Sequence, residues 1–115
     1  MDAGARTYYI PNMKSEAADR LTPAQLEGAA VVFAALGHPV RLRIVAGLLS
    51  GECCVGPMAE CLGLSQPFVS RHLAVLREAG VITSRVEGRQ RVYRVSHPAA
   101  ASFVTAVQST SWGEP

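Results

Sequence analysis

The sequence predicts a mainly helical α+β fold, in which four helices are followed by a two-stranded hairpin and a fifth helix. Two observations lead to this prediction. An amphipathic segment begins at Ser65, ends at Gly80 and is followed at once by two strand-like runs, 81–86 and 91–95. Further upstream, apolar residues recur at helical spacing behind helix-start signals. With 115 residues, of which 49% are hydrophobic and 17% charged, the chain is expected to form one small ordered domain.

A proline marks the predicted start of each of the first two helices. Thr22 precedes Pro23, and a hydroxyl cap followed by proline is typical of the beginning of a helix. This helix is expected to end at Gly37. A second helix is expected from Pro39 to about residue 49, because its apolar residues lie at helical spacing and Gly51 follows it.

The next two helices are predicted to form a helix-turn-helix. A short helix from about residue 56 to 62 leads through Gly63 into the amphipathic helix. Ser65 is a good N-cap for that helix, and Pro67 suits its first turn, where a backbone N–H has no helical partner. After the hairpin, whose turn contains a glycine, a last helix is expected over about 98–109. Two helices joined by a glycine turn and followed by a hairpin make a winged helix-turn-helix.

This domain is expected to span residues 21–112, after a flexible N-terminal arm of residues 1–20. No apolar run approaches the roughly 20 residues needed to cross a bilayer, and the first residues lack the apolar core of a signal peptide. We therefore expect a cytoplasmic protein with no membrane partner. In such a protein the three cysteines are expected to be thiols rather than a disulfide framework.

Charge and periodicity predict the function of the amphipathic helix. Val69, Leu73 and Leu76 share one face at a 3.6-residue period, with His72 at its edge. The opposite face carries Gln66, Ser70, Ala74 and Arg77, with Arg71 beside it. Residues 66–95 hold six arginines and two glutamates, a local charge of +4, whereas the rest of the chain sums to −2. A basic patch on a mildly acidic body is typical of a nucleic-acid-binding protein.

Three stretches carry a resemblance to a known family: ALGHPVRLRIVAGLLSGE, GLSQPFVSRHLAVLREAGVI and EGRQRVYRV. Over roughly residues 28–110 the chain resembles the ArsR/SmtB family of bacterial metal- and thiol-responsive repressors, and among them the arsenic- and thiol-responsive members. The resemblance implies a homodimer formed by the first and last helices. Its two recognition helices would enter successive major grooves of double-stranded operator DNA, about 34–36 Å apart. Binding of an inducer would release the operator.

The resemblance also implies which residues contact DNA. Gln66, Ser70, Arg71 and His72 match the positions that the family projects toward DNA, and the first three have side chains that suit base or phosphate contacts. For His72, a buried structural role is equally open. In the hairpin we expect contacts with the sugar-phosphate backbone or an adjacent minor groove from Arg85, Arg89, Gln90 and Arg91.

The inducer must be inferred from Cys53, Cys54 and Cys61. Arsenite-responsive members of the family carry Cys-Val-Cys near the start of the third helix. Here Cys54 takes the first position and Gly56 the second, so the usual set of three thiolates is absent. Seven residues of helix between Cys54 and Cys61 correspond to a rise of roughly 10.5 Å, too far for both thiols to meet one arsenic atom. A complete arsenic site would therefore require the cysteine pair to fold back toward Cys61, or a ligand from the other subunit.

Two interpretations of these thiols remain open. Soft thiolates select thiophilic species such as As(III), Sb(III) or Hg(II), so we predict that one of these is the inducer and that no permanent cofactor is bound. Alternatively, the adjacent pair is oxidised by peroxide or reactive sulfur. Cys53 and Cys61 are also candidates for small buried core residues, and for Cys61 alone the core role is favoured.

Other functional classes are less well supported. Residues 98–112 contain no His, Asp or Glu, so the zinc site that some family members build on their last helices cannot form there. An enzyme is not expected, because no candidate base lies near the cysteines in the sequence. A winged-helix protein-interaction module without DNA binding is the remaining alternative, and the arginines of the hairpin argue against it.

Overall fold

The computed structural model describes residues 20–113, so the predicted arm of residues 1–20 lies almost wholly outside the described residues. The first two helices begin and end close to where the sequence predicts. Helix α3 spans Pro23–Leu36, and the Thr22 side chain and the Gln25 side chain cap it reciprocally. Helix α4 spans Pro39–Ser50 and is capped by the His38 ring, whose Nδ1 accepts from the Val40 N–H.

The second half of the domain also follows the predicted order. Helix α5 spans Val55–Leu62 and α6 spans Gln66–Glu78, with Gly63 in the left-handed conformation between them. Strands β2 and β3 span Ile82–Glu87 and Gln90–Val95, and α7 spans Ala100–Gln108. These elements form a winged helix-turn-helix, as predicted.

The sheet contains one strand that the sequence analysis missed. Strand β1 consists of Cys53–Cys54 alone and pairs antiparallel with β3, so the strand order is β1-β3-β2. Cys53 lies opposite Tyr93, and Cys54 opposite Val92. The pairing ties the start of α5 to the hairpin, and therefore joins the cysteines to the wing, which we define as β2, β3 and their turn.

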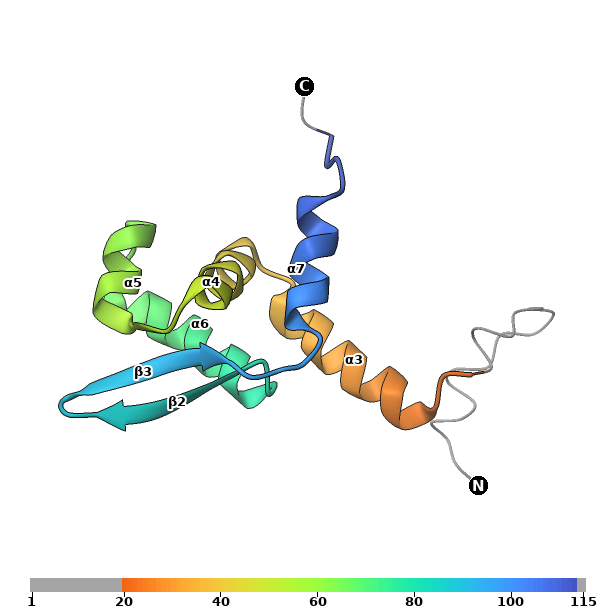
Figure 1. Cartoon of the computed structure of the whole chain (residues 1–115), viewed down its shortest axis with the longest axis horizontal. Helices are drawn as coiled ribbons and strands as arrows, with labels where there is room; N and C mark the ends of the chain where they lie inside the picture. Colours follow the sequence, from red (N-terminus) through yellow and green to blue (C-terminus); the bar gives the residue numbers. More distant parts are fainter. Residues whose placement is uncertain (1–19, 114–115) are drawn as a thin grey trace.

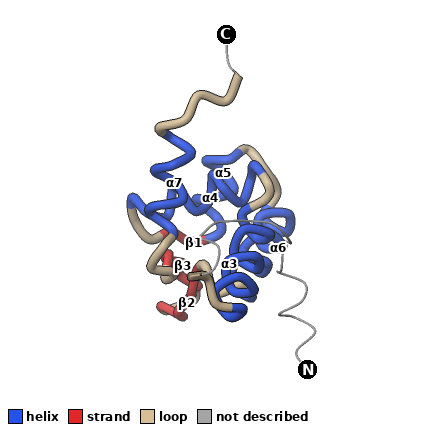
Figure 2. The backbone as a smooth tube through the Cα atoms, turned by 90° about the vertical axis from the view of Figure 1, so that its right-hand side faces the viewer, coloured by secondary structure: helices blue, strands red, loops and turns tan. Residues whose placement is uncertain are grey.

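Figure 2 shows the strands gathered at the lower left, beside the helices. The core is centred on α4, α6 and the sheet, and α3, α5 and α7 each add buried residues to it. Its largest fully buried side chains are Leu73, Leu76, Ile82, Val45, Val69 and Val81. The apolar face predicted for the amphipathic helix is therefore the buried face of α6. Helices α3 and α7 extend away from this body (Figure 1). Of the helices in residues 20–113, none could cross a membrane by itself; α3 and α4 have a suitable composition only as a pair bent by 100°.

Candidate functional site

The exposed face of α6 begins directly at the helix N-terminus. The Ser65 hydroxyl accepts from the Phe68 N–H at 3.3 Å, and Pro67 occupies the first turn, so the helix start is well defined. Gln66, Ser70 and Arg71 are all exposed. The structure thus leaves these three predicted residues on the solvent side of the helix, where their hydrogen-bonding groups can reach another molecule.

His72 lies on the other side of the helix. It is only 9% exposed, and its Nδ1 lies 3.2 Å from the Arg41 Nη1. Its ring packs against the His38 ring at 4.4 Å and the Phe68 ring at 4.7 Å between centroids. The expectation that His72 contacts DNA is therefore corrected, and the alternative of a buried, satisfied histidine describes its position. Phe68 itself is half-buried.

The His72 contact joins the exposed helix to the corner between α3 and α4. Arg41 Nε also donates to the Ala35 carbonyl oxygen. Because a guanidinium only donates hydrogen bonds, the Nδ1 of His72 must accept from Arg41 and carries no proton. The sequence offered no signal for this pair, because 31 residues separate its members.

Acidification is expected to destabilise the fold through His72. Burial lowers its pKa, and the neighbouring His38 ring and the positive charges of Arg41 and Arg71 lower it further. The unfolded chain, with an ordinary histidine pKa of about 6.5, then binds a proton more readily than the native state. The free energy of unfolding should therefore be fully retained above about pH 7 and decrease as the pH falls through 6.5.

Urea unfolding at pH 7.5, 6.5 and 5.5 tests this expectation. His72→Gln removes the titrating ring but keeps a side-chain oxygen that can accept from Arg41. The variant should lose less stability than the unchanged chain between pH 7.5 and 5.5. Equal losses in the two proteins would show that His72 does not carry the pH dependence.

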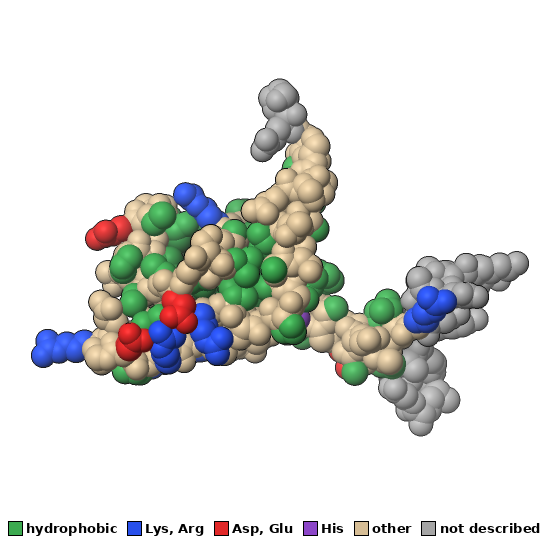
Figure 3. Space-filling model, viewed as in Figure 1, with side chains coloured by type: hydrophobic (Ala, Val, Ile, Leu, Met, Phe, Trp, Pro, Cys, Tyr) green, Lys and Arg blue, Asp and Glu red, His purple; other side chains and the backbone are tan. Residues whose placement is uncertain are grey.

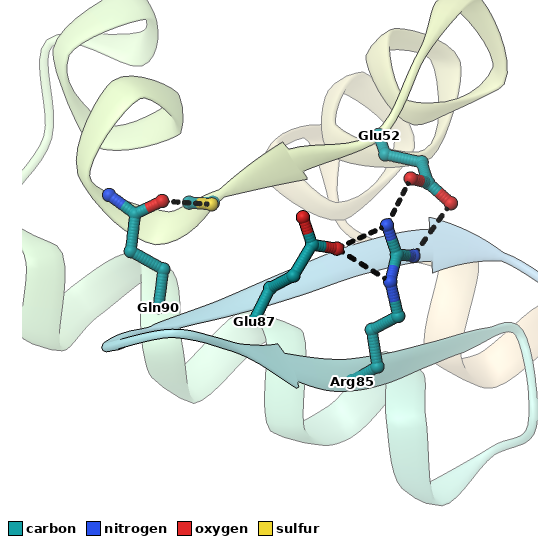
Figure 4. A network of polar contacts seen from close by, with 5 residues as sticks. Glu52, Arg85, Glu87 and Gln90 are labelled. Atoms are coloured by element: carbon teal, nitrogen blue, oxygen red, sulfur yellow. Dashed lines mark hydrogen bonds and ion pairs between the residues drawn. The ribbon is translucent and has the colours of Figure 1, made fainter.

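Arg85 is held by two carboxylates on one face of the sheet (Figure 4). Its Nη1 and Nη2 donate to Glu52 Oε2 and Oε1 at 2.9 and 2.7 Å, and its Nε donates to Glu87 Oε2 at 2.8 Å. The hydrogen bond from Arg85 lowers the pKa of Glu52, and both carboxylates raise the pKa of Arg85. Arg85 was predicted to contact DNA; in this structure two glutamates offset the charge of its guanidinium.

The tip of the wing presents the other predicted residues to solvent. Gly88 and Arg89 form its two-residue turn, and Gly88 has a φ of +64°, a conformation that glycine adopts without steric cost. Arg89, Gln90 and Arg91 are exposed, and Arg91 donates to the Ser84 hydroxyl at 3.1 Å. Arginine side chains project from this part of the molecule in Figure 3.

The three cysteines do not converge on one point. Successive residues of a strand point to opposite faces, and Cys53 packs against the core, whereas the Cys54 thiol lies 3.3 Å from Gln90 Oε1. Cys61 is exposed on α5, which corrects the expectation that it is a core residue. Within residues 20–113 no group of three or more His, Cys, Asp or Glu side chains is arranged to hold a metal ion.

A short two-stranded wing beside a capped helix with an exposed polar face defines the class of winged helix-turn-helix regulators. The model for bacterial regulatory proteins of the arsR family matches residues 38–84. A biofilm growth-associated repressor of Xylella fastidiosa is 42% identical over 72 residues, 63% of each chain. Its Agrobacterium fabrum counterpart is 38% identical over 78 residues, 68% of this chain and 67% of that protein. The chain belongs to the ArsR family.

A solved structure supports the same assignment. The homodimeric winged helix-turn-helix DNA-binding domain Mb0332 of Mycobacterium bovis superposes with a TM-score of 0.68 at 28% identity, covering 86% of this chain and 87% of that one. The matched part spans less than two thirds of the Xylella repressor. The names of these relatives are those of regulators, in agreement with the prediction that the chain is not an enzyme.

Proposed function

We propose that the chain is a transcriptional repressor that binds double-stranded operator DNA as a homodimer in the cytoplasm. The observation that carries this proposal is the exposed hydrogen-bonding face at the beginning of α6, next to the wing with its arginines. Gln66 and Arg71 have the side chains that pair bidentately with adenine and guanine in the major groove, and Ser70 suits either bases or phosphate. His72 supports this face from behind, through Arg41 and Phe68.

Exposed apolar side chains on α3 and near α7 support the homodimer. Val31 and Phe33 are 54% and 55% exposed, and Trp112, just beyond α7, is 66% exposed. Phe33 also contacts Phe103 of α7, with ring centroids 5.0 Å apart, so the two helices share one apolar surface. Such a surface is expected to be covered by a second subunit, in the arrangement that the resemblance implies.

Phosphate contacts are assigned to the wing tip. Arg89 lies in the exposed turn, and no ion pair to it is found among residues 20–113, whereas two glutamates hold Arg85. Arg89→Ala should weaken DNA binding and reduce the slope of log K against log salt by about two, because each subunit of the proposed homodimer neutralises one fewer phosphate. Arg85→Ala should leave that slope nearly unchanged.

Fluorescence anisotropy with a labelled duplex from the DNA upstream of the coding sequence, at several salt concentrations, measures both variants. Equal changes of slope for Arg85→Ala and Arg89→Ala would contradict the assignment of phosphate contacts to the tip. An affinity of the unchanged chain that did not fall with added salt would contradict DNA binding through phosphates altogether.

We further propose that a thiophilic species such as As(III), Sb(III) or Hg(II) releases the operator by binding cysteine thiols. The contact between Cys54 and Gln90 favours this proposal, because it places a thiol against a wing residue of the proposed DNA surface (Figure 4). Within the described part of one subunit, residues 20–113, three ligands are not preassembled, so binding by these residues requires a rearrangement or a ligand from the second subunit. Oxidation of the same thiols by peroxide or reactive sulfur is the second candidate.

The Cys54→Ser variant separates these possibilities. A serine hydroxyl can keep the contact with Gln90, so operator binding should be retained, while release by As(III) should be lost. Anisotropy titrations with As(III) and with hydrogen peroxide, on reduced protein, measure the release. Cys61→Ser, the same substitution at the thiol of α5, is measured for comparison with Cys54→Ser. Release of Cys54→Ser at the same As(III) concentration as the unchanged chain would show that Cys54 is not the sensing thiol.

A further inference from the structure

A pocket of about 640 Å³ lies between the second half of α4 and the β1–α5 segment. Hydrophobic side chains gather on the side of the molecule where α4 and α5 lie (Figure 3). The wall of the pocket is mainly apolar and includes Ile44, Leu48, Met58 and Leu62. Among its lining residues, only Arg43 and Glu52 carry a charge. A volume of this size and a wall of this composition are typical of sites for small organic ligands.

Two of the three thiols of the chain line this pocket. Cys53 reaches it from β1, and Cys61 reaches it from α5, whereas Cys54 is absent from the lining. The thiols therefore divide into a pair that lines an apolar pocket and a single one against the wing. A thiol in an apolar wall selects a ligand that combines an apolar body with an electrophilic centre, since the body is held by burial and the centre reacts with sulfur.

We propose that this pocket binds apolar organic electrophiles of the α,β-unsaturated carbonyl class, which alkylate Cys53 or Cys61. The thiolate sulfur attacks the β-carbon and forms a carbon–sulfur bond. The electron pair of the carbon–carbon π bond moves to the α-carbon, which takes up one proton, replacing the proton that the thiol lost. The product is a thioether, and the step needs no oxidant and no metal.

The position of the pocket connects it to the DNA-contacting elements. Helix α5 is the first helix of the helix-turn-helix, and a Cβ placed on its Gly56 would lie 3.6 Å from Gln66 Nε2 of α6. Strand β1 pairs with β3 of the wing. A ligand bound in the pocket would contact β1 and α5, and through them would change DNA binding. This consequence rests on the proposed repressor function, whereas ligand binding itself does not.

Two maleimides with the same electrophilic ring test the pocket without DNA. N-phenylmaleimide carries an apolar ring, and N-(carboxymethyl)maleimide carries a charge. The rates of modification of each cysteine, followed by peptide mass spectrometry, are divided by the rate of each reagent with glutathione. The phenyl reagent should be favoured about tenfold at Cys53 or Cys61, the gain expected from burying much of its ring. At Cys54 the two corrected rates should agree within about twofold, because that thiol lies outside the pocket.

Gly47→Leu provides a variant that fills the pocket. Gly47 lines it, and a Cβ at this position meets no atom within 4 Å, so the leucine can be accommodated. The preference for the phenyl reagent should disappear in this variant. It should persist in Gly28→Leu, the same change at an exposed glycine of α3 with equally open surroundings. Equal preference at all three cysteines of the unchanged chain, or a preference that survives Gly47→Leu, would overturn the proposal. Neither result depends on whether the chain binds DNA.

Discussion

Replacing Arg71 with alanine is expected to reduce operator affinity by about 30-fold or more, because each subunit of the proposed homodimer loses one bidentate contact with guanine, worth about 1–3 kcal/mol. The Arg71 side chain is exposed at the beginning of α6, with its guanidinium carbon 5.8 Å from the centroid of the Phe68 ring. Packing on that ring limits the orientations of the guanidinium, which favours a defined contact. Anisotropy with the upstream duplex at constant salt measures the change.

Arg77→Ala is the matched control for this prediction. Arg77 is also an exposed arginine of α6, but it lies in the last turn, away from the end of the helix that enters the groove. Its loss should weaken binding much less than the loss of Arg71. Equal losses would indicate that α6 contributes only general positive charge. Circular dichroism of both variants would confirm that the helices remain intact.

Leu73→Ala is expected to lower the free energy of unfolding by about 2–5 kcal/mol, the usual cost of such a truncation in a packed core. Leu73 is 1% exposed and lies on the buried face of α6, between Val69 and Leu76. The truncated side chain would leave a cavity behind the same helix that presents Gln66 and Arg71. Urea unfolding at a fixed protein concentration measures the change, because dimer formation makes stability depend on concentration.

Val75→Ala is the control on the same helix. Val75 is 38% exposed, so removing its methyl groups should cost less than about 1 kcal/mol. A loss as large as that of Leu73→Ala would mean that Val75 is buried in solution. The natural cover would then be the second subunit, and the loss should shrink as the protein is diluted and the dimer dissociates.

Local signals made most of the fold predictable. Thr22 with Pro23, and Ser65 with Pro67, mark helix starts through interactions within one turn, and the structure places helix starts at both. The hairpin was predictable for the same reason, since Gly88 and the flanking alternation act over a few residues. Strand β1 was not predictable, because a strand of two residues has no periodicity, and the strand β3 that pairs with it lies about 40 residues further along the chain.

The sequence by itself determined the order of the helices and hairpin, the polar face of α6 and the basic character of the wing. All three depend on residue type and on spacing over a few positions. The tertiary structure alone decided how the charged and titratable residues are used. It buried His72 against Arg41, set Arg85 against Glu52, and placed Cys53 with Cys61 but apart from Cys54. These outcomes depend on contacts between residues distant in the chain, and periodicity carries no information about such contacts.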